Sequence, residues 1–490
     1  MKKLNDLTKH LLVKELTNTG DPVITSLEMD SREVEKGSLF FCIKGYTVDG
    51  HDFARQAEER GAAALVAERP VNVNIPVVLV KDVKKAMAVM SNVFYDFPTN
   101  SFQLVGITGT NGKTTTSHLV EAMFRRASKK TGLVGTMYTK IGDRETEAKN
   151  TTPESLVLQK LFMEMREKQV EACAMEVSSH ALDLGRTHGC DFNTAVFTNL
   201  TKDHLDYHHT MEAYKQAKSL LFSQLGNTYD GNRKTAVLNA DDSASKDFMR
   251  MTAAQVLTYG IETECDIRAK NVVITPTETT FTLTTPWEER LVTMSLIGKF
   301  SVYNALAAAA ACLAEGVSID VIVETLEETK GVAGRFESVD AGQDFAVIVD
   351  YAHTPDSLEN VLETIQGITE GRVITVVGCG GDRDATKRPE MANIAIQYSN
   401  HSIFTSDNPR TEDPQKILGD MTTGLQEKGS YQVIVDRREA IRKAVKEAGD
   451  GDVVLIAGKG HETYQDVGDK VLDFDDREEA RQAIQMLKEL

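Results

Sequence analysis

The chain has 490 residues and a mass of 54.0 kDa, which suits about three domains of average size. Its composition, 41% hydrophobic and 26% charged, excludes a disordered or fibrous protein. The formal net charge is −18, so the surface repels nucleic acid and anionic membrane, and we expect neither as a partner. The longest apolar stretch, residues 305–314, is about half of the ~20 residues that a membrane-spanning helix needs, so we expect no membrane insertion.

The cysteines and the N-terminal segment indicate the compartment in which the protein acts. Six cysteines are spread along the chain without a CxxC pair, which favours a reduced protein with buried, unreactive thiols. The N-terminal segment MKKLNDLTKHLL begins basic but has no apolar core followed by a small-residue cleavage site. The sequence therefore predicts a cytoplasmic protein without a signal peptide.

Three blocks follow one another along the chain. The first, residues 1–98, ends at Phe97-Pro98, where the proline disfavours helix at the residue before it. The second, residues 99–330, opens with an apolar run, a glycine turn and a helical pattern, which begin a β-α-β unit. In the third, residues 331–490, each apolar run precedes a helix-like stretch, as in a doubly wound parallel sheet. The sequence therefore predicts an α/β protein of three domains.

Short apolar runs mark the predicted strands. They cover residues 38–43, 62–67 and 76–80 in the first block, 102–107, 172–177 and 194–199 in the second, and 346–349, 372–377, 401–405 and 453–457 in the third. Helical patterns cover residues 113–126 and 302–315. Before the second of these helices, threonine-rich alternation over residues 265–297 predicts antiparallel strands.

The strongest local signal is the segment 106–114, Gly-Ile-Thr-Gly-Thr-Asn-Gly-Lys-Thr. Glycines let successive backbone N–H groups point at one anion, and the helix that follows adds its positive end. Lys113 would reach the outer phosphates of a nucleotide, and the Thr114 hydroxyl would bind magnesium. The spacing departs from the usual G-x-x-x-x-G-K-[ST], because Ile107 stands where the first glycine is expected. A glycine-rich turn without a ligand is the alternative, but the strand before and the helix after it favour a phosphate loop.

Polar residues also follow two apolar strands of the second block. Glu176 ends the run 172–175, and the carboxyl ends of strands hold the ligands in open α/β sheets. A carboxylate there can bind magnesium directly or through water, whereas the alternative is a solvated side chain. His204 comes just after the run 194–199. Because imidazole is an unusual magnesium ligand, its spacing alone favours a helix-capping or hydrogen-bonding histidine.

Lys218 lies in residues 214–222, Tyr-Lys-Gln-Ala-Lys-Ser-Leu-Leu-Phe, which form an amphipathic helical pattern. From this pattern alone, a lysine on a solvated helix face is expected. Nothing in the composition around it indicates another role.

Taken in order, these motifs resemble the Mur ligase family. The phosphate loop, Glu176, TNLTKDHLDYH and AKSLLF follow one another, and four later segments agree with the family, namely residues 298–304, 334–337, 350–353 and 407–410. The resemblance covers nearly the whole chain. It implies a small N-terminal α/β domain for a UDP-muramoyl substrate, a central P-loop ATPase-like domain and a C-terminal Rossmann-like domain for an amino acid.

For the nucleotide, the resemblance implies ATP as co-substrate and Mg²⁺ as cofactor. The family's phosphate loop corresponds, with its own spacing, to Thr108, Gly109, Thr110, Asn111, Gly112, Lys113 and Thr114, and positions near the nucleotide correspond to Asn304, Arg335 and Asp350. The implied metal ligands are Thr114, Glu176 and His204, and the implied catalytic residues are Lys113, Glu176, His204 and a carbamylated lysine at Lys218. Carbamylation turns an ammonium into an anionic carbamate, which can approach magnesium where a cation is repelled.

For the UDP-linked substrate, the family pattern points to residues in the first two blocks. They are Ser31, Tyr46, Thr47, Val48, Thr151, Thr152, Ser178 and Arg186. The chain departs from some relatives two residues before this arginine, where Leu184 replaces a glutamine. One contact to the muramoyl-peptide is therefore not expected here.

For the amino acid, the segment Asp-Asn-Pro-Arg at 407–410 carries the specificity that the resemblance implies. Arg410 follows the strand 401–405 in a loop stiffened by Pro409, and a guanidinium can bind a carboxylate through two hydrogen bonds. Meso-diaminopimelate has a far-end carboxylate that lysine lacks, and lysine-adding relatives differ at this arginine. A solvated arginine in a surface turn is the alternative. The implied amino-acid contacts are Arg383, Asp407, Asn408, Pro409, Arg410, Gly458 and Glu462.

The implied reaction is ATP-dependent addition of meso-2,6-diaminopimelate to UDP-N-acetylmuramoyl-L-alanyl-D-glutamate through an acyl phosphate. We expect small-molecule substrates only and a monomeric enzyme. Three alternatives remain at this stage: a lysine-adding member of the family, a ligase resembling folylpolyglutamate synthase, and a P-loop switch that hydrolyses nucleotide without forming an amide.

Overall fold

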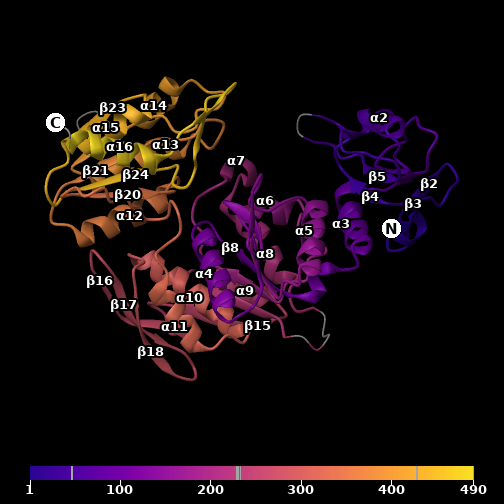
Figure 1. The fold of residues 1–490 in the computed structure, drawn as a ribbon, viewed down its shortest axis with the longest axis horizontal. Helices are drawn as coiled ribbons and strands as arrows, with labels where there is room; N and C mark the ends of the chain where they lie inside the picture. The colour runs from indigo at the N-terminus through magenta and orange to yellow at the C-terminus, as the bar shows by residue number, and fades with distance from the viewer. Residues whose placement is uncertain (46–47, 228–230, 232, 426–428, 489–490) are drawn as a thin grey trace.

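The computed structural model describes residues 1–45, 48–227, 231, 233–425 and 429–488. Figure 1 shows an N-terminal body and a C-terminal body on either side of a central one. The main sheets of the described chain have five, eleven and six strands. This arrangement confirms the predicted α/β class with three bodies.

The N-terminal body contains the five-stranded sheet, in the order β2-β7-β6-β5-β4, which is parallel except for β2. Helix α3 packs against α5 of the central body, and Leu156 of α5 joins the same buried cluster as Met87 and Met90 of α3. The N-terminal body is thus joined to the central one by an apolar contact. Its elements are β1 (Lys2–Lys3), α1 (Leu4–Thr8), β2 (Glu15–Thr17), β3 (Val23–Ile24), β4 (Ser26–Glu28), β5 (Ser38–Phe41), α2 (Ala54–Glu59), β6 (Ala64–Ala67), β7 (Val77–Leu79) and α3 (Val83–Phe94).

The central sheet has the order β11-β10-β9-β12-β8-β13-β14-β15-β16-β17-β18. It is parallel from β9 to β16 and antiparallel at both edges. Its strands are β8 (Gln103–Thr108), β9 (Thr131–Val134), β10 (Tyr138–Ile141), β11 (Arg144–Glu147), β12 (Ala172–Glu176), β13 (Thr194–Phe197), β14 (Thr235–Asn239), β15 (Gln255–Gly260), β16 (Ile267–Ile274), β17 (Thr279–Thr284) and β18 (Glu289–Met294). Because β8 lies between β12 and β13, the carboxyl ends of these three parallel strands meet at one place, where open α/β sheets bind ligands.

Helices cover the faces of the central sheet and bury its strands. They are α4 (Lys113–Arg126), α5 (Ser155–Glu167), α6 (Ser179–Asp183), α7 (Leu205–His208), α8 (Met211–Ser223), α9 (Ser245–Met251), α10 (Lys299–Ala314) and α11 (Ile319–Glu328). The apolar α10 packs against α4 and against four neighbouring strands, which explains why it is buried almost throughout. It begins before the predicted residue 302, because Gly298 turns the chain with a φ of +101° directly before Lys299.

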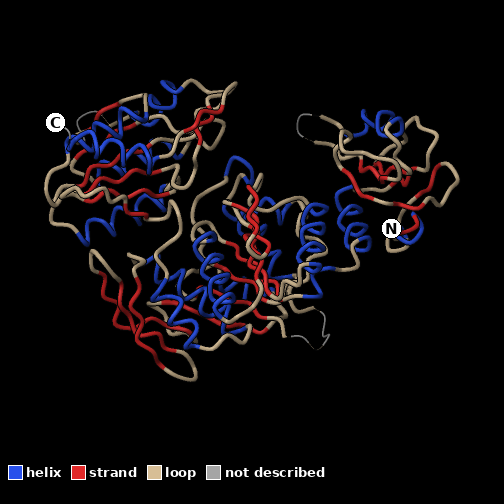
Figure 2. Tube along the Cα trace, viewed as in Figure 1, coloured by secondary structure: helices blue, strands red, loops and turns tan. Residues whose placement is uncertain are grey.

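The C-terminal sheet has the order β19-β20-β24-β21-β22-β23 and is parallel apart from β19. Figure 2 shows its strands stacked between layers of helix, so both faces are covered. Its elements are β19 (Glu337–Ser338), β20 (Ala346–Asp350), α12 (Pro355–Ile368), β21 (Val373–Val377), α13 (Lys387–Tyr398), β22 (His401–Phe404), α14 (Pro414–Thr422), β23 (Tyr431–Val433), α15 (Arg437–Glu447), β24 (Val453–Ala457), a hairpin of β25 (Tyr464–Asp466) and β26 (Val471–Asp473), and α16 (Asp476–Lys488).

The predicted strands are confirmed, each to within two residues at either end, and the helix predicted at 113–126 has those bounds. The threonine-rich stretch forms β16, β17 and β18, which extend one edge of the central sheet. Within the described ranges, no helix combines the length and apolar character needed to cross a membrane.

The cysteines of the chain are free, as predicted, but burial is complete for only four of them. Cys190 and Cys265 are half-buried, which corrects the expectation that all six thiols are buried. Burial still raises the pKa of Cys190 to about 12 and of Cys265 to about 11. Their thiols therefore stay protonated and poorly nucleophilic at neutral pH.

Candidate active site

The glycine loop between β8 and α4 has the geometry of a phosphate loop. Gly109 and Gly112 have positive φ angles of +152° and +84°, which L side chains rarely adopt. A Cβ at Gly109 would collide with the Thr198 hydroxyl, and one at Gly112 with the Asn304 side chain. The strand, turn and helix predicted around this loop are confirmed, and the loop lies at the carboxyl end of the central sheet.

Two lysine ammonium groups contact the same part of this loop. Lys113 Nζ donates to the carbonyls of Gly109 at 3.0 Å and Thr110 at 2.8 Å, and Lys218 Nζ donates to the Gly109 carbonyl at 2.8 Å. Burial lowers the pKa of both lysines, and that of Lys218 lies well below its usual value. The like charge of Lys113 lowers the pKa of Lys218 further.

The structure corrects the solvated face expected for Lys218 from its helical pattern. Lys218 is only 1% exposed, because α8 packs against α6. Its ammonium lies over the Tyr214 ring, 4.4 Å from the ring centroid. The exposed side of α8 carries Glu212 and Gln216 instead, whereas Lys218 lies on its buried side and points to the phosphate loop.

Glu176 is fully buried at the end of β12, which rules out the solvated alternative. Its carboxylate accepts hydrogen bonds from Thr114 Oγ1 at 3.0 Å, from Thr136 N at 3.0 Å and from Thr136 Oγ1 at 2.9 Å. No cation lies within ion-pair distance of it among the described residues. A buried carboxylate without a counter-ion, beside a phosphate loop, is a receptor for a cation.

His204 stands directly before α7 with a left-handed φ of +54°, but its side chain makes no capping hydrogen bond. Its Nε2 lies 3.2 Å from Asp203 Oδ2, and its ring meets that of His180 edge-on at 4.9 Å. Burial, helped by the charges of Lys113 and Lys218 and opposed by that of Asp203, lowers its pKa to about 3. His204 therefore occupies the N-cap position, as expected, but its side chain pairs with Asp203 and does not cap the helix.

A cavity of about 390 Å³ opens beside the phosphate loop, between the central and C-terminal bodies. It is lined by Asn111, Gly112, Asn304, Arg335 and Asp350, all of which the sequence predicted. Asp350 ends β20, where burial raises its pKa to about 6 and its Oδ2 accepts from Phe336 N at 2.6 Å. The structure thus brings residues from three separate segments to one pocket.

Arg335 joins the phosphate loop to the C-terminal body. Its Nη2 donates to Thr114 Oγ1 at 3.1 Å, and its guanidinium lies 4.5 Å from the centroid of the Tyr351 ring. The loop residue Asn111 makes a second connection, donating through Nδ2 to Asp356 Oδ2 of α12 at 2.7 Å. The two bodies are therefore linked through the residues that surround the cavity.

Several cavity residues were not found by sequence reasoning. Thr198 and Asn199 hold the loop, since Thr198 Oγ1 donates to the Asn111 carbonyl at 2.6 Å and Asn199 Oδ1 accepts from Asn111 N at 2.9 Å. Asp241 lines the cavity from another strand end and accepts from Tyr303 at 2.8 Å. Thr198 and Asn199 directly follow β13, so the strand-end rule that singled out Glu176 could have found them.

Four residues predicted for the UDP-linked substrate cluster behind Glu176. Thr152 Oγ1 donates to the Glu176 carbonyl at 2.9 Å and accepts from Ser178 N at 3.0 Å, and Arg186 Nη1 donates to the Thr152 carbonyl at 3.1 Å. Thr151 Oγ1 lies 3.1 Å from Thr136 Oγ1. Their contacts connect this cluster directly to the candidate cation receptor.

The other residues predicted for that substrate belong to the N-terminal body. Ser31 donates to Gln56 Oε1 at 3.0 Å, and Val48 is 59% exposed. Neither forms a hydrogen bond or ion pair with the cluster of the central body, within the part of the chain described. Tyr46 and Thr47 lie outside the described residues. Leu184 directly follows α6 and offers no polar side-chain atom there.

The residues predicted for the amino acid follow three adjacent strands of the C-terminal sheet. Asp407, Asn408, Pro409 and Arg410 follow β22, Arg383 follows β21, and Gly458 and Glu462 follow β24. The carboxyl ends of these parallel strands lie together, so the loops meet at one edge. Arg383 is exposed and its Nη1 donates to the Asp382 carbonyl. Its side chain still lies beside this cluster, because a Cβ at Gly380 would be within 4.0 Å of both Arg383 Cγ and Arg410 Nη1.

Arg410 is not the solvated side chain of a surface turn. Its Nη1 donates to the Gly381 carbonyl at 2.7 Å, its backbone N–H donates to the Asp466 carbonyl at 3.1 Å, and its φ is +51°. Only 26% of the side chain is exposed. The guanidinium is thus held by neighbouring loops while part of its donor set stays available.

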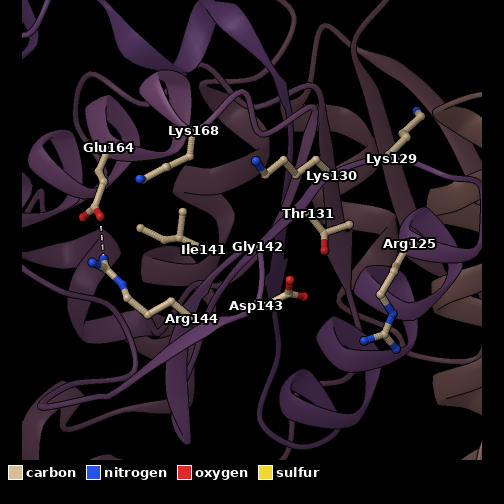
Figure 3. Close-up of a pocket in the computed structure, with 10 residues that line it drawn as sticks. All are labelled: Arg125, Lys129, Lys130, Thr131, Ile141, Gly142, Asp143, Arg144, Glu164 and Lys168. Carbon is tan, nitrogen blue, oxygen red and sulfur yellow. Dashed lines mark ion pairs between the residues drawn. The ribbon is translucent and has the colours of Figure 1, made fainter.

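A pocket of about 410 Å³ elsewhere in the central body contains none of the predicted site residues. Figure 3 shows cationic side chains around it, with Arg144 paired to Glu164 at 2.6 Å. Arg125 lies in the last turn of α4, and Lys168 directly follows α5. Cations at these positions complement the negative ends of helices, which explains the charge of this pocket without a ligand.

Comparison with known proteins places this geometry in a family. Residues 23–96 match the model described as "Mur ligase family, catalytic domain", residues 107–312 match "Mur ligase middle domain", and residues 334–460 match "Mur ligase, glutamate ligase domain". Together these matches cover most of the chain and all three bodies.

Relatives of similar length share most of the sequence. The chain is 60% identical to a UDP-N-acetylmuramoyl-L-alanyl-D-glutamate–2,6-diaminopimelate ligase of Bacillus cereus, with 95% of this chain and 94% of that protein covered. It is 59% identical to the protein of the same name from Bacillus licheniformis, covering 99% of this chain and all of that one.

Solved structures show the same architecture. A structure of a UDP-N-acetylmuramoyl-L-alanyl-D-glutamate–2,6-diaminopimelate ligase superposes with a TM-score of 0.68 at 33% identity, and covers 95% of both chains. MurF of Thermotoga maritima in complex with ADP has a TM-score of 0.63 at 19% identity, covering 94% of this chain and 96% of that one, and shares the fold. With its three bodies matched in order and near-full-length relatives at about 60% identity, the chain belongs to the Mur ligase family.

Proposed function

We propose that the protein is the ATP-dependent ligase that adds meso-2,6-diaminopimelate to UDP-N-acetylmuramoyl-L-alanyl-D-glutamate in the cytoplasmic synthesis of a peptidoglycan precursor. The observation that carries this function is Arg410, a partly available guanidinium held at the strand ends of the C-terminal sheet. The near-full-length relatives of that name support it. We also propose that it acts as a monomer.

The three bodies supply three binding sites in this proposal. We assign residues 1–98 to the UDP-muramoyl group, residues 99–330 to ATP, and residues 331–490 to the amino acid. Two connections support a nucleotide site between the last two, namely Arg335 with Thr114 and Asn111 with Asp356. The Thr152–Glu176 hydrogen bond supports a dipeptide site next to the phosphates.

Magnesium fits the residues beside the phosphate loop. Mg²⁺ prefers oxygen ligands and binds through one or two carboxylates together with substrate phosphates. Thr114 Oγ1 and Glu176 Oε2 lie 3.0 Å apart, and Glu176 has no counter-ion in the described chain. Among the described residues, no group of three or more His, Cys, Asp or Glu side chains is arranged to hold a metal by itself. Thr114 and Glu176 would hold it, with His204 nearby, and the ion would neutralise charge on the phosphates.

The reaction needs a carboxylate to become a good electrophile. Transfer of the γ-phosphoryl group of ATP to the D-glutamate side-chain carboxylate gives an acyl phosphate, whose phosphate leaves readily. Lys113, which already contacts the loop carbonyls, would turn to the transferring phosphoryl group and stabilise its charge. The amine of diaminopimelate then attacks the acyl carbon, and the tetrahedral intermediate loses phosphate to form the amide.

Residues of the chain determine where each substrate lies around the reacting groups. The loop N–H groups and Lys113 bind the phosphates, Arg186 and Thr152 lie on the dipeptide side, and Arg410 lies on the amino-acid side. A lysine-adding ligase would leave Arg410 without its carboxylate partner. Folylpolyglutamate synthases share the fold at 15% identity, but the match covers only 76% of this chain.

Isotope transfer tests this function directly. With the γ-carboxylate of the dipeptide labelled with ¹⁸O, we expect one label to appear in the released phosphate, because the carboxylate oxygen attacks the γ-phosphorus and leaves with it. Release of phosphate should require the dipeptide and diaminopimelate together. Nucleotide hydrolysis that is independent of the dipeptide, with unlabelled phosphate, would instead indicate a P-loop switch.

Asp350 makes the affinity for nucleotide depend on pH. Burial raises its pKa to about 6, against the lowering effect of Arg335 and of the Phe336 N–H. In our proposal the ionised carboxylate accepts from ribose hydroxyls, so protonation below this pKa removes an acceptor. We expect the Kd of a non-hydrolysable ATP analogue to rise about tenfold between pH 7 and pH 5. Calorimetry should show this change in the natural protein and a weak, pH-independent affinity in Asp350→Asn, whereas the same Kd at both pH values in the natural protein would contradict the role.

A further inference from the structure

Lys459 is a fully buried lysine that the reaction described above does not use. It follows β24, and its Nζ donates to Asn408 Oδ1 at 3.0 Å and to Glu462 Oε2 at 2.8 Å. The ammonium also lies 5.3 Å from the centroid of the Tyr464 ring. Because a buried ammonium is costly unless it is paired and hydrogen-bonded, its place here requires both polar partners.

Only one of the two carboxylate oxygens of Glu462 accepts hydrogen bonds from the described residues. Its Oε2 accepts from Lys459 and also from Asn408 Nδ2 at 2.8 Å. Its Oε1 has no hydrogen-bond partner among the described residues and is not among their buried, unpaired polar atoms. One oxygen is therefore fixed by the protein, and the other is accessible to a ligand with an N–H donor.

Asn408 connects this carboxylate to the loop of Arg410. Asn408 Oδ1 also accepts from Asp466 N at 2.9 Å, and the Asp466 carbonyl accepts from Arg410 N at 3.1 Å. Lys459 thus stands at the start of a chain of hydrogen bonds that ends at the backbone of Arg410. A substitution at Lys459 would therefore change the positions of both the free Glu462 oxygen and the Arg410 guanidinium.

We propose that Lys459 is a positioning residue of the amino-acid site: it holds Glu462 as the receptor for an ammonium group of the substrate and holds the loop that presents Arg410 to a carboxylate. This role rests on the proposed function. At the far end of meso-diaminopimelate an ammonium and a carboxylate share one carbon, so their receptor needs an anion and a cation on neighbouring loops. Glu462 and Arg410 supply this pair, and Asn408 couples them.

The charge of Lys459 also keeps Glu462 ionised. Burial raises the pKa of Glu462 and the charge of Asp407 raises it further, whereas Lys459 and the hydrogen bond from Asn408 lower it. Arg437 of α15 and the neutral Tyr351 and Tyr464 also face this carboxylate. Without the Lys459 charge, the pKa of Glu462 would rise further, and a protonated Glu462 would lose its attraction for an ammonium.

Steady-state kinetics of Lys459→Met test the proposal. At pH 7 we expect the KM for diaminopimelate to rise about 30-fold, the loss typical of a charged hydrogen-bonding group, with the KM for ATP unchanged. As the pH is raised above 7, this KM should fall toward the natural value, because a higher pH favours the ionised form of Glu462. The same change at an exposed lysine of the β25–β26 turn, Lys470→Met, is the matched control and should leave every constant unchanged.

Other outcomes distinguish failure of the positioning role of Lys459 from failure of the proposed function. A KM for diaminopimelate that stays unchanged in Lys459→Met, or one that is raised equally at every pH, would overturn the positioning role. If Lys459→Met does not fold, Glu462→Gln carries the test: it should raise the same KM at all pH values without changing the KM for ATP, and an unchanged KM would overturn the role. A natural protein that does not add diaminopimelate at all would instead refute the proposed function.

Discussion

Replacing Arg410 with glutamine is expected to lower kcat/KM for diaminopimelate about 100- to 1000-fold, the cost of removing one partner of a buried charge pair. The natural guanidinium is held by the Gly381 carbonyl and by the backbone bond to Asp466, so it meets the far-end carboxylate without further ordering. Glutamine keeps a donor at this place but loses the charge and the planar fork.

The same variant should change specificity as well as rate. Lysine has no far-end carboxylate, so any incorporation of lysine by the natural protein would owe nothing to Arg410 and should hardly change in the variant. The preference for diaminopimelate over lysine should therefore fall by about the same factor as kcat/KM. Arg442→Gln is the control: Arg442 is a partly exposed arginine of α15 that pairs with Glu439, and its loss should leave both amino acids unaffected.

Loss of Lys218 is expected to have an effect of similar size on kcat. We propose that its amine attacks CO₂, forms an N–C bond and releases a proton, which leaves an anionic carbamate beside the phosphate loop. The structure supports this chemistry, because burial and the neighbouring Lys113 lower the pKa of Lys218 and so raise the fraction of neutral amine. An anion at this place would help to hold a metal cation near Glu176.

For Lys218→Met we expect kcat to fall about 100- to 1000-fold, with partial recovery when a short carboxylate such as acetate replaces the carbamate. In the natural protein, ¹³CO₂ should give a carbamate carbon resonance that is absent from the variant. Lys215→Met on the same helix is the control, since Lys215 is paired with Asp247 and Glu212 and its pKa is raised. A variant at Lys218 with full activity, or a natural protein without the resonance, would contradict the carbamate.

The sequence predicted those parts of the site whose residues lie in one short segment with a recognisable local pattern. The strand, glycine turn and helix around Lys113 are local, and their bounds follow from apolar patterns and glycine spacing. Glu176 could be placed at a strand end for the same reason. Arg410 could be placed in its loop, although its bond to Gly381 could not, because the two residues lie in loops that follow different strands.

The parts that could not be predicted depend on packing between distant segments. Lys218 has the pattern of a solvated helix face, and only the packing of α8 against α6 shows that it is buried. His204 looked like a cap, yet it lies near two lysines from other helices. Lys459 lies in a short glycine-containing segment whose sequence has no hydrophobic periodicity. Its burial follows from the loops that β22, β24 and β25 bring together.

The most direct measurement is mass analysis of the product formed from ATP, UDP-muramoyl-dipeptide and an equimolar mixture of diaminopimelate and lysine. The natural protein should give almost only the diaminopimelate tripeptide. Arg410→Gln should give a mixture in which the ratio of the diaminopimelate tripeptide to the lysine tripeptide is much lower. A natural protein that adds lysine instead, or an Arg410→Gln variant that keeps the full preference for diaminopimelate, would contradict the account.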